Sequence, residues 1–290
     1  MTHAPLIAVT GASGQLGRLA IQFLLSRHPA ARILAIARDP AKIADLAEAG
    51  VQVRQGDYDR PDTLDAALAG VERLLLVSSS EIGKRAPQHQ AVIDAAIRAG
   101  VGLVAYTSLL HADTSPLGLA VEHVQTEQAL QASGLPHALL RNGWYAENYT
   151  AGIAGALQHG VVLGSAGDGR LSLAARADYA EAAAIIMAGD ATQAGKVYEL
   201  AGDHAITLTD FAALVARQTG IPIAYQDLPQ QDYRDALLSA GLPGFVADLL
   251  SDSDAGAAKG GLFDDSGTLG RLIGRATTPI EDVIASALAG

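Results

Sequence analysis

The sequence predicts an α/β protein built on a doubly wound parallel sheet, with a smaller, mostly helical C-terminal lobe. Three observations favour this fold class. Short apolar runs alternate with helical patterns through the first half of the chain, and a glycine-rich turn separates the first run from the first helix. Beyond about residue 151 this rhythm gives way to frequent glycines. We therefore expect one large sheet domain and a lobe of different construction.

Six strands are expected before about residue 142, because short continuous apolar runs are typical of buried parallel strands. They are Leu6–Thr10, Arg32–Ala37, Gln52–Gln55, Arg73–Val77, Leu103–Thr107 and His137–Arg141. The helices between them begin at about Gln15, Ala41, Pro61, Lys84 and Leu117. Several of these helices end at a glycine suited to a left-handed cap, namely Gly50, Gly70, Gly100 and Gly134.

In the second half, Tyr179–Ala188 and Lys196–Leu200 predict a helix and an edge strand that return to the sheet domain. That domain would span residues 1–150 and be completed by 178–202, leaving 151–177 and 203–290 for the lobe. Within the lobe we expect helices over Asp210–Thr219 and Gln231–Ala240. A flexible loop is expected at Asp252–Asp254, which precedes several glycines.

Composition narrows the function classes. The 290 residues are 49% hydrophobic, enough to bury the core of a large domain and a lobe. Cysteine is absent from the sequence, which excludes disulfides, a thiolate nucleophile and cysteine-ligated metal centres. A formal charge of −11 disfavours binding to nucleic acid or to an anionic membrane. Because residues 1–5 show no charged leader and no long uncharged apolar stretch follows, we expect a cytoplasmic protein without membrane insertion.

The segment Val9–Gly17 carries glycines at positions 11, 14 and 17, on the turn between the first strand and the first helix. Glycine permits a tight turn and close approach of a pyrophosphate, while free amides and the helix dipole favour its negative charge. In this strand-to-helix context the spacing predicts a Rossmann-like dinucleotide site. A glycine turn that merely joins strand to helix is the alternative.

Arg38, at the tip of the second strand, favours NADP over NAD because a guanidinium can pair with a ribose 2′-phosphate. Asp39, one position later, leaves NADH possible as a weaker cofactor. The alternative for Arg38 is a solvent-exposed loop residue without a ligand. After the third strand, Asp57 could accept from the adenine amine and Tyr58 could cover the base. Asp57 is equally an ordinary turn residue before Pro61.

Several segments together resemble the NmrA-like, atypical short-chain dehydrogenases, over essentially the whole chain. They are the glycine turn, Arg38, Ser78–Ser80, Tyr106–Asp113, Leu140–Tyr149 and Gly260–Ser266. Within that family the sequence closely resembles bacterial quinone oxidoreductases. The resemblance implies a flavin-free enzyme that passes hydride from NADPH to a quinone.

The resemblance also implies where the dinucleotide lies. Gly11–Leu16 would wrap the pyrophosphate, Arg38 the 2′-phosphate, Ser78–Ser80 the central part and Asn142–Glu147 the nicotinamide end. The expected cofactor residues are thus Gly11, Ala12, Ser13, Gly14, Gln15, Leu16, Gly17, Arg38, Asp57, Ser78, Ser79, Ser80, Asn142, Gly143, Trp144, Tyr145, Ala146 and Glu147. Strand order supports this independently, because Ser78–Ser80 and Asn142 follow strands and so lie on the ligand-bearing sheet edge.

The chain departs from ordinary short-chain dehydrogenases at their catalytic tyrosine and lysine, where Leu119 and His123 stand. This disfavours alcohol–ketone chemistry, which needs a proton donor in the site, but suits a quinone, because hydride addition gives a stable hydroquinone anion. His123 is a candidate proton donor; a solvated surface residue beside Glu122 and Glu127, on an exposed helix, is the alternative.

Asn148 is the first candidate to contact a quinone oxygen, since an amide can donate to developing negative charge. Tyr145, with Trp144 and Tyr149, could form an aromatic face for a flat quinone. The alternative is that these rings pack the lobe. With no HExxH motif and no dense His, Asp and Glu cluster, no metal site is expected.

Three other functions stay open from the sequence. A nonenzymatic NADP(H) sensor that binds a regulatory protein would tolerate the missing tyrosine and lysine. A scaffolding protein would need an exposed apolar patch and neither Arg38 nor the glycine turn. Reduction of an enone-type substrate is a third possibility. Assembly into a homo-oligomer is compatible with any of them.

Overall fold

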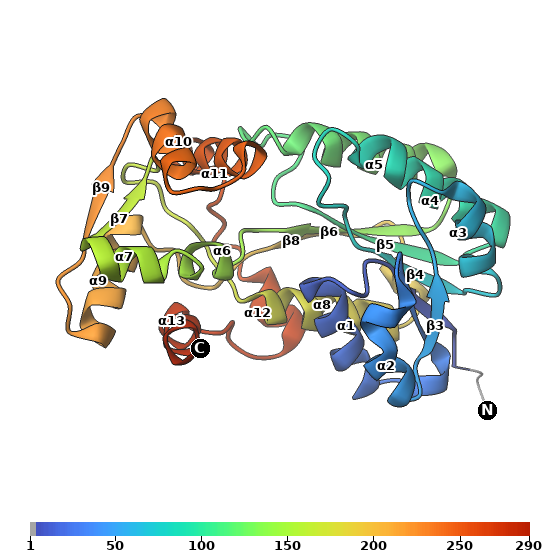
Figure 1. Cartoon of the computed structure of the whole chain (residues 1–290). Helices are drawn as coiled ribbons and strands as arrows, with labels where there is room; N and C mark the ends of the chain where they lie inside the picture. The colour runs from blue at the N-terminus through green and yellow to red at the C-terminus, as the bar shows by residue number, and fades with distance from the viewer. Residues whose placement is uncertain (1–3) are drawn as a thin grey trace. The chain divides into compact units, whose positions relative to one another are not determined.

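The computed structural model describes residues 4–290, so residues 1–3, on which part of the expectation of no leader rests, lie outside the described chain. The chain forms two compact units (Figure 1). Unit 1 comprises the residues up to Ala112, Val121–Asn142 and Arg176–Tyr198. Unit 2 comprises Asp113–Ala120, Gly143–Ala175 and Glu199–Gly290. Each unit therefore combines segments that are far apart in the sequence.

Unit 1 is organised around a seven-stranded sheet of order β3-β2-β1-β4-β5-β6-β8. The strands are β1 (Ile7–Val9), β2 (Ile33–Ala37), β3 (Gln52–Gln55), β4 (Arg73–Leu76), β5 (Leu103–Leu109), β6 (His137–Asn142) and β8 (Val197–Leu200). From β3 to β6 every neighbouring pair is parallel. The predicted doubly wound parallel sheet is confirmed, with all six early strands found and Lys196–Leu200 giving an edge strand.

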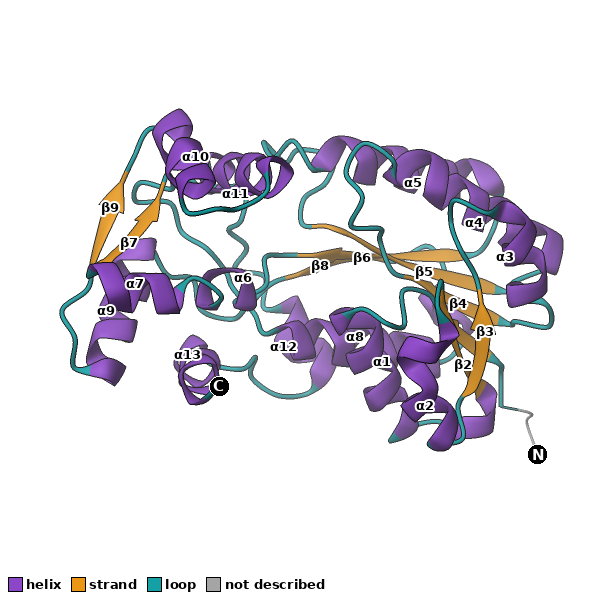
Figure 2. Ribbon diagram, viewed as in Figure 1, coloured by secondary structure: helices purple, strands orange, loops and turns teal. Residues whose placement is uncertain are grey.

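Helices cover both faces of this sheet. Those of unit 1 are α1 (Gln15–Leu25), α2 (Ala44–Glu48), α3 (Pro61–Leu68), α4 (Arg85–Ala99), α5 (Ala120–Ser133) and α8 (Arg176–Ala188). Figures 1 and 2 show α3, α4 and α5 on one face and α1, α2 and α8 on the other. Gly100 ends α4 in the left-handed conformation, with φ +68°, as the sequence predicts.

Two predicted helices begin later than expected. The pattern from Ala41 contains a 3-10 turn (Pro40–Ile43) before α2, because the Asp39 carboxylate accepts the Ala41 N–H at 3.1 Å and fixes a tighter turn there. The pattern from Leu117 becomes helical only at Ala120. The core of unit 1 packs the apolar sheet face against α3, α4 and α5, around the fully buried Tyr106.

Unit 2 is mostly helical, as predicted, and also contains a small parallel sheet that the sequence analysis did not anticipate. Its strands are β7 (Val161–Gly164) and β9 (Ala224–Asp227). Its helices are α6 (Glu147–Thr150), α7 (Ile153–His159), α9 (Leu208–Thr219), α10 (Gln230–Ser239), α11 (Gly244–Ala257), α12 (Thr268–Ile273) and α13 (Ile280–Ala289). Phe211, Val215 and Ile284 lie at the centre of one apolar cluster in this unit.

The expectation of a flexible loop at Asp252–Asp254 is wrong. These residues lie inside α11, and Ser253 and Asp254 are buried. The Asp254 carboxylate accepts hydrogen bonds from the Tyr149 hydroxyl and from the Ser165 backbone N–H. These donors lie about ninety to a hundred positions away in the sequence, so the local sequence does not reveal them. The nearby acids and glycines alone are typical of a loop, which explains the wrong prediction. Across residues 4–290 we find no helix with the length and apolar character needed to cross a membrane.

Candidate functional site

The predicted glycine turn follows β1 and leads into α1. Gly11 adopts φ +60°, and a Cβ added at Gly17 would lie 2.5 Å from the Gly11 carbonyl oxygen, so only glycine permits this approach of helix to turn. Gly14 caps α1 without a side-chain hydrogen bond, which leaves the first N–H groups of the helix for an anion. Gly11, Ser13, Gly14 and Gln15 are exposed, whereas Ala12, Leu16 and Gly17 are buried. The turn therefore fits a pyrophosphate bound through backbone amides.

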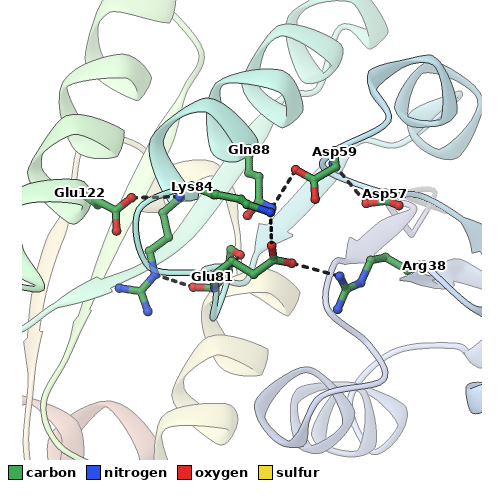
Figure 3. Close-up of polar contacts among 9 residues, drawn as sticks. Arg38, Asp57, Asp59, Glu81, Lys84, Gln88 and Glu122 are labelled. Carbon is green, nitrogen blue, oxygen red and sulfur yellow. Dashed lines mark hydrogen bonds and ion pairs between the residues drawn. The ribbon is translucent and has the colours of Figure 1, made fainter. Parts of the chain in front are cut away.

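Arg38 lies directly after β2, and its side chain is 68% exposed. Its Nη1 donates to Glu81 Oε1 at 3.0 Å (Figure 3). The backbone carbonyl of Arg38 accepts from Gln55 Nε2 at 3.1 Å. The Asp39 carboxylate, by contrast, is engaged by the backbone of the following 3-10 turn. The guanidinium is thus a paired but accessible cation at the tip of β2.

Asp57 and Tyr58 follow β3. Asp57 Oδ1 accepts the Asp59 N–H at 3.1 Å, an arrangement typical of a turn aspartate. The Tyr58 hydroxyl lies 2.6 Å from Thr10 Oγ1 and 3.0 Å from the Val77 carbonyl oxygen, and burial raises its pKa above the ordinary value. These contacts favour a packing role for Tyr58. Contact of either residue with adenine stays a prediction.

Ser78–Ser80 follow β4, and side chains of unit 1 hold this segment from behind. The Ser78 N–H donates to Thr107 Oγ1 at 2.8 Å, and the Ser79 N–H donates to His89 Nε2 at 2.9 Å. The Ser79 carbonyl accepts from Arg85 Nε at 2.5 Å. Because these backbone groups are occupied, a ligand would meet mainly the serine hydroxyls and the edge of the chain.

His89 is a buried base with a fixed tautomer. Since Nε2 accepts from Ser79, the ring proton lies on Nδ1, which is 2.9 Å from Thr126 Oγ1. Burial, with a smaller contribution from the Arg85 charge, lowers the pKa of His89 to about 3. The imidazole is therefore neutral at physiological pH and serves to hold Ser79.

The alternative reading of His123 as an exposed surface residue is wrong, because its side chain is only 5% exposed. Its Nδ1 lies 2.8 Å from the Tyr106 hydroxyl, and its Nε2 faces Arg85 Nη1 at 3.5 Å. Burial, followed by the charge of Arg85, lowers the pKa of His123 to about 3. A neutral imidazole enclosed by these groups favours a structural role over the predicted role of proton donor.

Glu127, which the same alternative reading places beside His123 on an exposed helix, is buried as well. Its carboxylate accepts from Arg141 at 2.9 Å (Nε) and 2.7 Å (Nη2), and from Ser108 Oγ at 2.5 Å. Arg141 directly follows the apolar run Ala138–Leu140 in β6. An arginine in a predicted buried strand requires a buried acid, and that signal could have located Glu127 as its partner.

Asn142 ends β6 in unit 1 and is 4% exposed. Among the side chains of residues 4–290, its Oδ1 is one of two buried polar atoms with no hydrogen-bond partner. A buried acceptor without a donor is a costly arrangement that a ligand amide or hydroxyl would relieve. Unit 1 thus brings the glycine turn, Arg38, Asp57, Ser78–Ser80 and Asn142 to the carboxyl ends of parallel strands.

The remaining predicted residues, Gly143–Asn148, belong to unit 2. The Gly143 N–H donates to the Leu200 carbonyl at 2.7 Å, and the Ala146 N–H to the Ala174 carbonyl at 2.9 Å, so the segment is anchored as backbone. Trp144 is 7% exposed, whereas Tyr145, Glu147 and Asn148 are partly exposed. Contact of these partly exposed side chains with a ligand stays a prediction.

Tyr149 packs within unit 2. Its ring lies 6.0 Å from that of Phe211, and its hydroxyl donates to Asp254 Oδ1 at 2.8 Å. Burial and the neighbouring Asp254 carboxylate raise the pKa of Tyr149. These contacts favour a packing role for Tyr149. In the part of the chain that the structure describes, no group of three or more His, Asp or Glu side chains could hold a metal ion.

Comparison with known proteins relates this geometry to characterised chains. The sequence is 57% identical to quinone oxidoreductase 2 of Escherichia coli (strain K12) over 279 residues, 96% of this chain and 97% of the relative. The crystal structure of an E. coli NADPH-dependent quinone oxidoreductase with NADPH matches at a TM-score of 0.95 and 56% identity, covering 97% of this chain and 99% of that one.

A second solved structure, of Citrobacter triphenylmethane reductase with NADP(H), matches at a TM-score of 0.93 and 34% identity. It covers 97% of this chain and 99% of that chain. The family model described as NmrA-like matches residues 3–266. The chain therefore belongs to the NmrA-like family.

Proposed function

We propose that this protein is an NADPH-dependent quinone oxidoreductase that works in the cytoplasm without flavin or metal. The observation that carries the proposal is the similarity, over nearly the full length of both chains, to a quinone oxidoreductase whose structure contains NADPH. The exposed glycine turn, the uncapped start of α1 and the accessible Arg38 independently support the NADPH part of this proposal. NADH is expected to be a weaker donor, since it lacks the phosphate that Arg38 would pair with.

Each part of the site has a separate task in this proposal. The turn amides bind the pyrophosphate, Arg38 binds the 2′-phosphate, and Ser78–Ser80 and Asn142 orient the central part and the nicotinamide end. Bound NADPH would transfer a hydride, which carries two electrons and one proton, to the quinone. A second proton, taken from water, would complete the hydroquinone. The protein contributes mainly positioning, which can supply several kcal/mol of barrier reduction.

Asn148 and Tyr145 are proposed to face the acceptor. The Asn148 amide would donate to the quinone oxygen on which negative charge develops, and Tyr145 would offer its ring to the flat substrate. Neither task requires a strong acid, which fits a chain with Leu119 and His123 at the positions of the usual catalytic tyrosine and lysine. A neutral, buried His123 then acts by supporting unit 1.

The test is to mix purified protein with NADPH or NADH and a simple benzoquinone, and to follow reduced-nicotinamide absorbance against the uncatalysed background. Wild type should oxidise NADPH faster than NADH. Arg38→Glu should lower kcat/KM for NADPH about tenfold to a hundredfold, the size of a lost charge-assisted phosphate contact, with little change for NADH.

Arg98→Glu is the matched control. Arg98, on α4, is an exposed arginine that forms an ion pair with Asp65 on α3. This substitution should change neither value. Equal losses for NADPH and NADH in Arg38→Glu would contradict the phosphate assignment. Tight NADPH binding without turnover would favour a nonenzymatic NADP(H) sensor instead.

A further inference from the structure

One carboxylate joins two cations at the ligand-bearing edge of the unit 1 sheet. Glu81 Oε1 accepts from Arg38 Nη1 at 3.0 Å, and Glu81 Oε2 lies 3.2 Å from Lys84 Nζ (Figure 3). The hydrogen bond and charge of Glu81 raise the pKa of Lys84. Glu81 therefore acts in this structure as the counter-ion of both cations.

The position of this cluster follows from strand order. Arg38 comes after β2 and Glu81 after β4, and β1 lies between these two strands in the sheet. The glycine turn follows β1. The Arg38–Glu81 pair thus connects the two sides of the turn that is proposed to bind the pyrophosphate. A dinucleotide on this turn would have its adenosine end within the same group of charges.

The three side chains are accessible enough to exchange partners. Arg38 and Lys84 are 68% and 62% exposed, and Glu81 is 32% exposed. Exposed ion pairs are worth little, about 0 to 1 kcal/mol, so a competing anion can break them. Glu81 is itself held near the serine segment, because its backbone N–H donates to Ser79 Oγ at 3.1 Å. The carboxylate would remain close after losing its partners.

Carboxylates surround Arg38 and Lys84, so an anion must carry a high negative charge to compete with them for these cations. Asp59 also acts electrostatically on Lys84, and its Oδ1 accepts from Gln88 Nε2 at 3.0 Å. Two cations therefore stand among carboxylates and offer little net positive charge. A phosphomonoester, with close to two negative charges and three acceptor oxygens, can replace Glu81 at the cations, whereas a neutral ribose hydroxyl cannot.

We propose that Glu81 is a resident counter-anion that a ribose 2′-phosphate displaces from Arg38 and Lys84, so that Glu81 and Lys84 together set the preference for phosphorylated dinucleotides. The proposal rests on the proposed function, in which Arg38 binds that phosphate. It adds a second cation to the phosphate site and a carboxylate that opposes binding there. Glu81 thereby limits affinity for NADPH without affecting NADH.

The test compares two ligands that share the adenosine end and differ in the 2′-phosphate, namely 2′,5′-ADP and 5′-AMP. Their dissociation constants are measured by calorimetry on the full-length protein, without any turnover. Glu81→Gln should bind 2′,5′-ADP about threefold to tenfold more tightly, because a competing charge is removed near the phosphate. Lys84→Met should bind it weaker by a similar factor. Neither change should alter binding of 5′-AMP.

Asp65→Asn is the matched control. It removes the same charge and breaks a similarly exposed ion pair, with Arg98, away from Arg38 and Lys84. It should leave both dissociation constants unchanged. Unchanged or weaker binding of 2′,5′-ADP by Glu81→Gln would overturn the counter-anion proposal. If instead wild type binds both ligands equally and Arg38→Glu changes neither, the assignment of the phosphate to Arg38 fails.

Discussion

Unit 1 and unit 2 each bury a polar network, and the two networks use ionisable groups of opposite kind. Behind Ser78–Ser80 in unit 1, His89 and His123 are held neutral, with pKa values lowered to about 3. Behind Tyr149 in unit 2, burial raises the pKa of Asp254 to about 6, although hydrogen bonds from Tyr149 and Ser165 oppose the shift. In both units burial disfavours the charged form and is the largest cause.

The difference teaches how each network responds to pH. A base whose pKa is lowered on folding stabilises the protein above its unfolded pKa, and this stability is lost as pH falls toward the folded value. An acid whose pKa is raised on folding contributes stability that is full below its unfolded pKa and is lost as pH rises through the folded value. The histidine network of unit 1 should therefore lose stability as pH falls below about 6.5, the unfolded histidine pKa. The Asp254 carboxyl of unit 2 should lose its contribution as pH rises toward about 6.

The largest expected effect comes from the two histidines. Between pH 7.5 and pH 5, each should cost about 2 kcal/mol of unfolding free energy, since the unfolded histidine gains a proton and the folded one does not. Urea denaturation of wild type across this range measures the loss. In a double variant, His89→Gln with His123→Gln, the loss of unfolding free energy between pH 7.5 and pH 5 should be smaller by about 4 kcal/mol. An unchanged slope in that variant would show that these histidines do not titrate on unfolding.

Asp254→Asn tests the opposite pH dependence expected for the buried acid of unit 2. From pH 7 down to pH 4 the folded wild type takes up a proton at Asp254 before the unfolded chain does, which adds about 2 to 3 kcal/mol of stability. The asparagine variant lacks this gain and should lose stability more steeply in acid. Parallel urea titrations of both proteins provide the measurement. Identical acid slopes would mean that Asp254 has an ordinary pKa.

A pair of tyrosine variants gives the smallest expected effect. Tyr149→Phe removes a donor from the buried Asp254 carboxylate and should cost about 2 kcal/mol at pH 7.5. Tyr106→Phe removes a contact to the neutral His123 and should cost about 1 kcal/mol. Urea denaturation under the same conditions compares them. Equal costs would indicate that the charge of the partner makes no difference at these sites.

The sequence predicts unit 1 well because its signals are local. Continuous apolar runs mark the parallel strands. Gly11, Gly14 and Gly17 mark the turn, and glycine is needed at position 17 because α1 there lies against the Gly11 carbonyl oxygen. The resemblance to the NmrA-like family, carried by segments such as Leu140–Tyr149, is confirmed by the match over residues 3–266. The NADPH and quinone contacts of individual residues stay predictions.

The errors arise where a polar residue is buried by partners distant in the sequence. His123 and Glu127 stand in a helix whose composition is typical of an exposed face, and their partners Tyr106 and Arg141 come from β5 and β6. Asp254 is similar, with Tyr149 as its distant donor. The strand β9 is short and polar, and pairs with β7 rather than with a sequence neighbour. Local periodicity carries no information about such pairings.

The division of the chain into interleaved segments has a consequence for its synthesis. Unit 1 needs Arg176–Tyr198 for α8 and for its share of β8, so it lacks an outer strand until about two thirds of the chain has left the ribosome. Residues 143–175 belong to unit 2 and must wait meanwhile for helices encoded after residue 199. Neither unit corresponds to a continuous fragment that could be expressed alone, and truncation within α8 should leave a nascent chain with exposed apolar sheet that chaperones would bind.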